Sequence, residues 1–547
     1  MATRTGKVIL AKGIRLDRSY KNVLSYTESQ MLNLVTTKKI FEGTDFSFVR
    51  PDGNQIDIEI PYGTALQSNY MAFQNPDYSN KWFFAFIDSV EYISNKTTRF
   101  TFTIDEFATW YDYWNPKQCF VVREHVNDDT VGAHTVPEGL ELGELVQNSS
   151  TNFEPDRTVW TSGQGEQLVN KYMIIFQVSE LPTGSYGISR PHRYNSVYSG
   201  LFYLGVKTPS DATALISKYA GESKPSSIVA IFLAPTAFFD DCQFSNIMTD
   251  YGNVTVYFPA EDTGVSDMSD NGYSISRPVS LNGYTPKNNK MYTHPFSYIM
   301  VDNNAGMCLT ERFEDFTNSA APSYYMGGAL GQGCSIKLSP IAYKGSIAEN
   351  YNESITAMKL PICGWSTDYY TNWLTQNALN IPLTIASAVG SAALGIASGG
   401  AGLAAAGGAL LGAGSKIANL LAEQYKAQLV PDQAHGNTNC SDINIAANHF
   451  FTVKCMSVKY EYAKIIDDFF TCYGYRVNSL KIPNQTGRPH WNFVQIADGD
   501  DIGFTKDTIS VPTKSMDTIN NIYRAGVTIW HNHDEIGNYA LDNSLGQ

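Results

Sequence analysis

Short stretches in which apolar positions alternate with polar ones recur through the first part of the chain. Asp57-Ile-Glu-Ile and Arg99-Phe-Thr-Phe-Thr-Ile alternate with a period of two, which predicts strands with one buried face. Phe120-Val-Val-Arg-Glu-His-Val predicts another strand. The run Trp82-Phe-Phe-Ala-Phe86 is too apolar for a surface strand, so we expect it to pack on both faces. Further on, Tyr172-Met-Ile-Ile-Phe-Gln-Val and Ser227-Ile-Val-Ala-Ile-Phe-Leu predict short buried strands.

A few segments predict helices, because apolar positions recur at helical spacing behind a capping residue or before a stop signal. Asp105 is placed to cap one helix, and Thr208 is placed to cap another. The predicted helices are 106–114, 212–219, 459–470 and 516–523. The segment Ala260–Lys290 is polar and rich in turn residues, which predicts an excursion over the surface.

The segment Ile381–Ser415 differs from the rest of the chain. No charged residue occurs from Tyr369 to Ser415, and the 34 residues from Pro382 onward include 9 Gly and 11 Ala. A hydrocarbon core of about 30 Å needs about 20 helical residues, so this length suits a hairpin better than one crossing. Its candidate membrane-active or lumen-plugging residues are Leu383, Ile385, Val389, Leu394, Ile396, Gly399, Leu403, Gly408, Leu410, Leu411, Gly412 and Ile417.

Three interpretations of this segment remain open: a buried or flexible Gly/Ala loop, a conditional membrane segment, and an ordinary transmembrane anchor. Leu and Ile contribute only about −0.3 to −0.6 kcal/mol each to insertion, and Gly and Ala add little. Insertion of one copy is therefore marginal, whereas several copies could insert cooperatively through small-xxx-small helix packing, such as Gly395-x-x-x-Gly399. An amphipathic helix follows at 416–426, before Pro431.

Composition favours a mainly β, multidomain protein. Aromatic residues make up 13% of the 547 positions and charged residues only 17%, and aromatic and β-branched side chains pack well on pleated surfaces. The net charge of −14 argues against a surface that grips phosphate. It is compatible with ordinary solubility, and also with a duct whose walls repel DNA.

Candidate chemistry is sparse. The eight cysteines include no CxxC pair, and the N-terminus lacks the apolar stretch of a signal peptide, so we expect assembly in a reducing cytoplasm. His531 and His533 stand two apart, which places them on opposite sides of an extended chain and suits one metal ion poorly. We predict no catalytic residue, no metal site and no cofactor.

Several blocks resemble the tail-knob, or distal tail-tube, proteins of phi29-like short-tailed bacteriophages. They lie at 70–86, 120–126 and 138–140 near the start. Near the end they are Gly474–Val477, Pro483-Asn484, Asn492–Gln495, Gly526–His531 and Ile536–Tyr539, and all occur in the family's order. The family also has a long Gly/Ala-rich apolar loop at the position of Pro382–Ser415.

The resemblance implies a homo-hexamer in the virion tail tip, with an N-terminal β-barrel like that of tail tubes. It implies that the loops plug the lumen, leave it during infection and help to penetrate the host cytoplasmic membrane. Expected partners are other tail proteins (lower collar or tail tube, and appendages), viral DNA that passes without specific binding, and the host membrane. The expected domains are a tube domain at 1–150, an inserted knob body at 151–365, the loop and helix at 366–430, and a C-terminal segment at 440–547 that contributes to the tube domain or an adjacent one.

Two other classes of function remain as alternatives. One is a receptor-binding adhesin, in which loops such as Ser266–Lys290 hold sugar and the Gly/Ala loop is only a structural plug. The other is a cell-wall hydrolase, although the chain has no GxSxG, HExxH or P-loop pattern.

Overall fold

The chain folds into two compact units in a computed structural model. Unit 1 contains Met1–Glu144, Gly283–Phe296 and Val458–Gln547, and unit 2 contains Leu145–Asn282 and Ser297–Ser457, so the chain passes between the units four times. The structure describes residues 6–46, 54–75, 78–153, 160–161, 167–168, 172–184, 193–194, 197–198, 200–222, 224, 227–236, 243–249, 252–258, 270–328, 330, 335–359, 362–363, 450–488, 492–503 and 510–541.

The first sheet of unit 1 is antiparallel and six-stranded, in the order β3-β1-β5-β6-β7-β4. Its strands are β1 (Gly6–Ala11), β3 (Lys39–Phe46), β4 (Gln55–Ile58), β5 (Tyr70–Asn75), β6 (Lys81–Tyr92) and β7 (Thr98–Ile104). Phe83 and Ala85 of β6 enter one hydrophobic core, whereas Phe84 and Phe86 enter another. The prediction that this run packs on both faces is confirmed.

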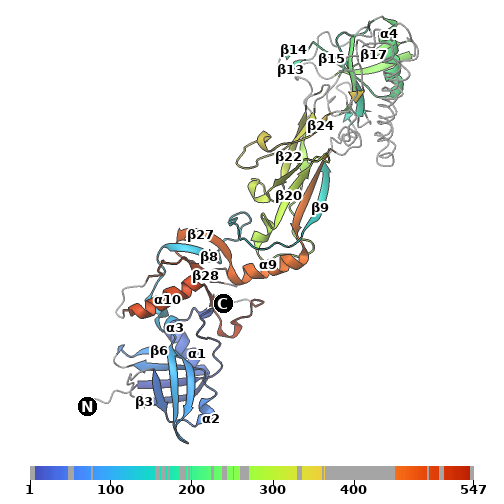
Figure 1. Cartoon of the computed structure of the whole chain (residues 1–547). Helices are drawn as coiled ribbons and strands as arrows, with labels where there is room; N and C mark the ends of the chain where they lie inside the picture. Colours follow the sequence, from blue (N-terminus) through green and yellow to red (C-terminus); the bar gives the residue numbers. More distant parts are fainter. Residues whose placement is uncertain are drawn as a thin grey trace, which may run out of the picture. The chain divides into compact units, whose positions relative to one another are not determined.

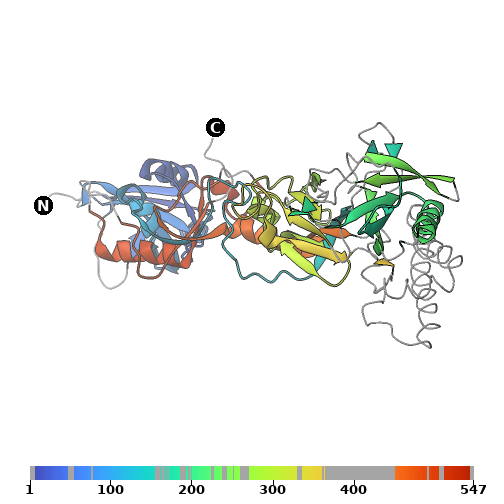
Figure 2. The ribbon, with the colours of Figure 1, turned by 90° about the horizontal axis from the view of Figure 1, so that it is seen from above.

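The second sheet of unit 1 joins the two ends of the chain. Its five strands, in the order β2-β29-β28-β8-β27, are β2 (Asn22–Leu24), β8 (Cys119–Glu124), β27 (Tyr475–Lys481), β28 (Phe493–Ile496) and β29 (Val527–Trp530). Strand β2 runs parallel to β29. In Figures 1 and 2 the C-terminal elements β28 and α10, drawn in orange to red, lie in the same unit as the blue N-terminal strands.

Short helices cover the sheets of unit 1. They are α1 (Glu28–Thr37), α2 (Tyr62–Ala65), α3 (Glu106–Trp110), α9 (Tyr460–Tyr473) and α10 (Thr513–Ala525), with 3-10 turns at Tyr111–Tyr113, Asn289–Tyr292 and His533–Glu535. The Asp105 side chain accepts from the Ala108 amide, as expected of a cap. The predicted helix 106–114 is too long, because the chain tightens into the 3-10 turn after Trp110.

Unit 2 is also built mainly from strands. A six-stranded sheet has the order β17-β18-β15-β12-β16-β25, and two four-stranded sheets have the orders β19-β22-β23-β24 and β21-β20-β26-β9. Its α4 helix (Pro209–Gly221) is capped by Thr208 as predicted. The strands of unit 2 have the bounds given next. They are β9 (Leu145–Phe153), β10 (Trp160–Thr161), β11 (Gln167–Leu168), β12 (Tyr172–Val178), β13 (Arg193–Tyr194), β14 (Val197–Tyr198), β15 (Phe202–Val206), β16 (Ile228–Pro235), β17 (Gln243–Thr249), β18 (Gly252–Phe258), β19 (Asp270–Ser274), β20 (Ser297–Asp302), β21 (Cys308–Glu311), β22 (Ser323–Gly328), β23 (Ser335–Pro340), β24 (Ile355–Lys359), β25 (Ile362–Cys363) and β26 (Phe451–Val458).

One prediction from composition is wrong for part of its segment. Where the structure describes the segment 260–290, exposed positions such as Val279 occur beside buried ones, so the segment is not an excursion throughout. Residues 270–274 form β19 in a sheet, Leu281 is buried, and Asn288 and Lys290 are buried in unit 1. A polar composition misled the prediction because these polar groups are paired inside the protein rather than solvated.

Candidate functional site

The two ends of the chain are fastened together in unit 1. The Ser25 amide donates to the carbonyl of Trp530 at 2.9 Å, and the Trp530 indole Nε1 donates to Asn22 Oδ1 at 2.8 Å. Trp530 is fully buried, so this bond satisfies a donor that has lost its water. The last strand of the chain therefore completes the fold that the first strands begin.

Two histidines near the C-terminus, His531 and His533, also contact the N-terminal part of the chain, each with a different partner. His531 Nδ1 lies 2.6 Å from Ser25 Oγ. His533 Nε2 accepts from the Arg15 amide at 3.0 Å, and its Nδ1 lies 2.8 Å from Asp534 Oδ1. Burial lowers the pKa of both imidazoles, which favours the neutral ring that an accepting nitrogen requires. Across the described part of the chain, no group of three or more His, Cys, Asp or Glu side chains is arranged to hold a metal ion.

A buried carboxylate on α9 fixes the short segment Gly283–Phe296. This segment belongs to unit 1, although in the sequence it lies between the two pieces of unit 2. Asp467 is 0% exposed. It accepts from Tyr284 Oη at 2.8 Å and from the Lys287 amide at 2.8 Å, and also from the amide and the Nδ2 of Asn288 at 3.1 and 2.8 Å. Four donors compensate for the loss of water around this carboxylate.

A second carboxylate extends the network. Glu138 pairs with Lys290 and Arg123 and accepts from the Arg476 amide at 2.9 Å. Burial lowers the pKa of Lys290, and the neighbouring Glu138 carboxylate opposes that shift. Positive and negative side chains thus meet in pairs, and removal of one partner would leave an uncompensated buried charge.

Arg488 joins the same network from the C-terminal part of the chain. Its Nη1 donates to Asn288 Oδ1 at 2.7 Å and lies 3.2 Å from Asp129 Oδ2. We call the set the junction cluster: Arg123, Asp129, Glu138, Asn288, Lys290, Asp467 and Arg488. It ties together three pieces of unit 1, each of which continues into unit 2.

The junction cluster was missed in the sequence, although one signal was present. Asp467 lies on the same face of α9 as the buried residues Ala463, Ile466 and Phe470. A carboxylate within the apolar stripe of an amphipathic helix indicates a buried, paired charge. The partners of Asp467 lie some 180 residues away in the sequence, so spacing alone does not reveal them.

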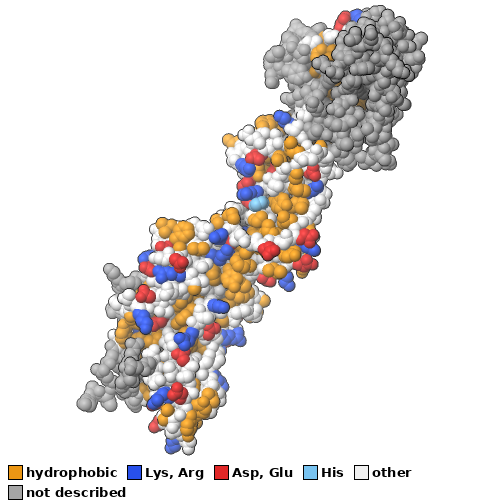
Figure 3. Space-filling model, in the orientation of Figure 1, with side chains coloured by type: hydrophobic (Ala, Val, Ile, Leu, Met, Phe, Trp, Pro, Cys, Tyr) orange, Lys and Arg blue, Asp and Glu red, His pale blue; other side chains and the backbone are white. Residues whose placement is uncertain are grey.

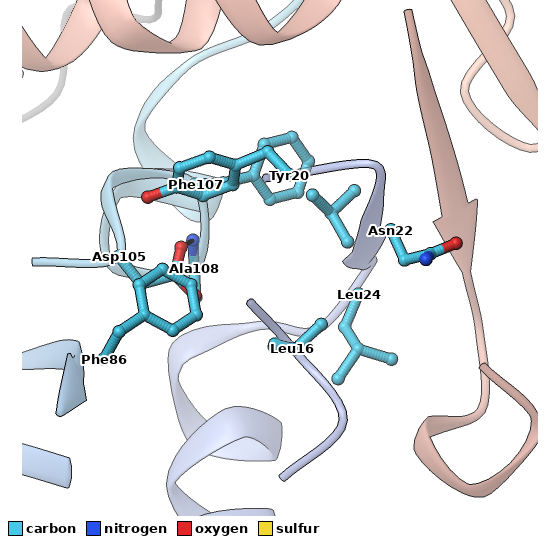
Figure 4. A pocket seen from close by; sticks show the side chains of 9 residues that line it. Leu16, Tyr20, Asn22, Leu24, Phe86, Asp105, Phe107 and Ala108 are labelled. Carbon is cyan, nitrogen blue, oxygen red and sulfur yellow. Dashed lines mark hydrogen bonds between the residues drawn. The ribbon is translucent and has the colours of Figure 1, made fainter. Parts of the chain in front are cut away.

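A small crevice in unit 1 lies beside the buried carboxyl group of Asp105. Figure 4 shows that it is lined largely by apolar side chains, including Leu16, Leu24 and Phe86. Tyr70 Oη donates to Asp105 Oδ2 at 2.7 Å, and burial raises the pKa of Asp105 to about 6. The crevice has room for about one water molecule, so we assign it to packing rather than to a ligand.

The predicted membrane-active residues lie outside the described residues. They are Leu383, Ile385, Val389, Leu394, Ile396, Gly399, Leu403, Gly408, Leu410, Leu411, Gly412 and Ile417. Among the helices that the structure does describe, none has both the length and the apolar character needed to cross a bilayer.

Comparisons with known proteins agree with this architecture. Residues 4–115 match the family described as the N-terminus of the caudoviral major tail protein. Residues 262–544, more than half of the chain, match the C-terminal domain of the tail knob protein gp9 of Bacillus phage phi29. A strand-rich, multidomain fold with these matches defines the class: a structural protein of a bacteriophage tail.

The chain belongs to the phi29 gp9 family of tail knob proteins, and the resemblance seen in the sequence is confirmed. It is 23% identical to the tail knob protein gp9 of Bacillus phage phi29 over 617 residues, which covers 97% of each chain. It is also 23% identical to the tail knob protein gp9 of Bacillus phage PZA, with the same coverage. The bacteriophage C1 tail knob protein, gp12, shares the fold with a TM-score of 0.64 at 12% identity, over 97% of this chain and 98% of that one.

Proposed function

We propose that this tail knob protein forms the distal tail tube as a ring of six copies, through which the genome leaves the virion. The observation that carries the proposal is the match of residues 4–115 to a major tail protein. These residues contain the six-stranded sheet, whose outer strands β3 and β4 each have one neighbour in the sheet. An open edge can accept a strand from another copy, so such sheets can extend around a ring.

Charge supports passage of DNA without binding. Six copies would carry −84, six times the −14 of one chain. A negative wall repels the phosphate backbone because like charges repel. A wall that neutralises no phosphates also gains no free energy from counterion release, so it does not hold the DNA. The proposal assigns no catalytic residue and no cofactor to the chain. It places the ring at the virion tail tip, in contact with other tail proteins and assembled in the host cytoplasm.

The uncharged segment Pro382–Ser415 is proposed to plug the lumen and later to enter the host cytoplasmic membrane. Its low hydrophobicity makes one copy a poor membrane segment, whereas six copies held together raise the local concentration and can pack through Gly and Ala. This part of the proposal rests on composition and on the family resemblance.

Two measurements test the proposal separately. Native mass spectrometry and electron microscopy of the purified chain test the ring, and a monomer at assembly concentrations would overturn it. Leakage of dye from liposomes tests the plug. We expect leakage from the intact protein and little from a variant in which 382–415 is replaced by a Gly/Ser linker of equal length. Equal leakage from both proteins would remove the membrane role.

A further inference from the structure

Helix α9 is apolar on two sides. Ala463, Ile466 and Phe470 face the interior of unit 1. On the outer side, Ile465 is 67% exposed and Tyr473 is 45% exposed. A helix that buries one apolar stripe and displays another is typical of a helix with a partner on each side.

The outer stripe of α9 continues onto the second sheet of unit 1. The Phe469 ring lies 5.1 Å from the Tyr473 ring, and the guanidinium of Arg123 on β8 lies 5.0 Å above Phe469. On the same sheet, Leu480 of β27 is paired with Phe120 of β8. Both are exposed. Strand β27 is also the outer strand of this sheet, so one edge of its backbone has no neighbouring strand there.

We define the apolar ridge as Phe120, Tyr462, Ile465, Tyr473, Leu480 and Ile482. Figure 3 shows apolar side chains gathered over β27 and beside α9. In the described part of the chain these six, each 39–67% exposed, are among only 17 large apolar side chains that are exposed. The rest are distributed over both units.

The exposed apolar area of the ridge is comparable with the apolar part of a standard protein interface. Its six side chains expose roughly 600 Å² of largely apolar surface, taking about 200 Å² for a fully exposed large side chain. A standard protein interface buries about 800 Å² per partner, of which somewhat over half is apolar. The largest apolar patch on a typical monomer is about 300–600 Å².

Charges beside the ridge favour a protein as the occupant. Glu461, Lys464 and Asp468 are exposed on α9, and Lys481 lies on β27, so both signs are present. A lipid surface or a nucleic acid would require a mainly basic border. A mixed polar rim around an apolar centre is typical of protein interfaces.

We infer that the apolar ridge is the surface through which one copy of this chain docks onto the next. The inference rests on the proposed ring, in which every copy needs an extensive contact with its neighbour. Because a ring uses two different surfaces on each copy, the ridge packs against another surface of the adjacent chain. The amide of Arg476 on β27 already donates to Glu138, but the part of the outer edge beyond Arg476 lets main-chain hydrogen bonds add to the apolar contact.

The test compares assembly of the full-length chain with that of an Ile465→Glu/Leu480→Glu variant, by native mass spectrometry across a concentration series. Both side chains are already exposed, so we expect the far-ultraviolet circular dichroism and melting midpoint of the monomer to be unchanged. We expect the concentration for half-assembly to rise by about a hundredfold or more, because the interface loses two apolar contacts and gains two charges.

A Met248→Glu/Ile347→Glu variant is the matched control, since both residues are exposed, apolar and in unit 2. We expect it to assemble as the wild type does. An assembled ridge variant, or equal loss of assembly in the control, would overturn the role of the ridge while leaving the ring intact. A wild-type chain that stays monomeric would overturn the ring itself. As a second readout, amides at 475–482 should exchange more slowly in the assembly than in the ridge variant.

Discussion

The two units bury polar groups in different ways. Unit 1 is assembled from three separate pieces of chain and holds them with the junction cluster and with histidines that accept hydrogen bonds. In unit 2 one large apolar core spans the sheets, and the carboxyl group of Glu311 is buried within that unit, where Tyr324 Oη donates to its Oε2 at 2.6 Å. Unit 1 also has apolar cores, but its three pieces meet at buried polar groups, where directional bonds fix their register. The two pieces of unit 2 share one apolar core, which is fitted through shape and area.

The largest expected effect is on the junction cluster. Replacing Asp467 by Ala leaves Asn288 and its neighbouring donors buried without an acceptor, so unit 1 should lose about 3–5 kcal/mol of unfolding free energy. Urea unfolding followed by hydrogen exchange of each unit measures this. Asp468→Ala, one position along on the solvent side of α9, is the control and should change little. Equal losses in the two variants would show that the cluster does not stabilise unit 1.

The second prediction concerns the pH dependence of the stability of unit 2. Burial raises the pKa of Glu311 from 4.5 to about 7, so folded unit 2 holds this proton more tightly than the unfolded chain does. The tighter binding of this proton stabilises folded unit 2. The stabilisation is complete below pH 4.5 and is lost as the pH rises toward 7, by roughly 3 kcal/mol of unfolding free energy. Glu311→Gln should abolish this slope in the melting midpoint of unit 2. Tyr324→Phe should move the slope to higher pH, since the hydroxyl stabilises the carboxylate. An unchanged slope in Glu311→Gln would assign the titration to another group.

Unit 1 should respond to acid through His125. Its Nδ1 accepts from the Phe493 amide at 2.7 Å, and burial, reinforced by Arg488, lowers its pKa to about 3. The neutral ring stabilises unit 1 above pH 6.5, and this contribution falls away as the pH drops toward 3, by about 2 kcal/mol at pH 5. Asp105 acts in the opposite sense, because its pKa is raised. Asp105 contributes equally to the wild type and to His125→Gln, so the difference between their plots of unit 1 stability against pH reports His125 alone. Identical plots for the two proteins would contradict the assignment.

The smallest expected effect concerns the closure of the chain ends. Ser25→Ala removes the hydroxyl beside His531 and should cost about 1 kcal/mol, as the loss of one partly buried hydrogen bond does. Ser29→Ala, on the exposed side of α1, is the control. Denaturant unfolding distinguishes the two variants. A loss in Ser29→Ala as large as that in Ser25→Ala would place the effect in local helix stability.

Local features of the sequence predicted local structure well. The caps at Asp105 and Thr208, the alternation in β4 and β7, and the doubly buried β6 are all present, because each depends on neighbours within a few residues. The junction cluster could not be predicted, since Asp467 finds its partners only after distant segments meet. The same cause explains the error at Asn288 and Lys290, whose polarity indicated solvent. The roles of the residues between Ile381 and Ser415 remain predictions, because they lie outside the described residues.

The passage of the chain between the units four times has a mechanical consequence. A pull on unit 2 is divided among four covalent connections, and each enters unit 1 at a piece of chain that the sheets or the junction cluster hold. Separating the two units completely would therefore require all four connections to be extended, not one.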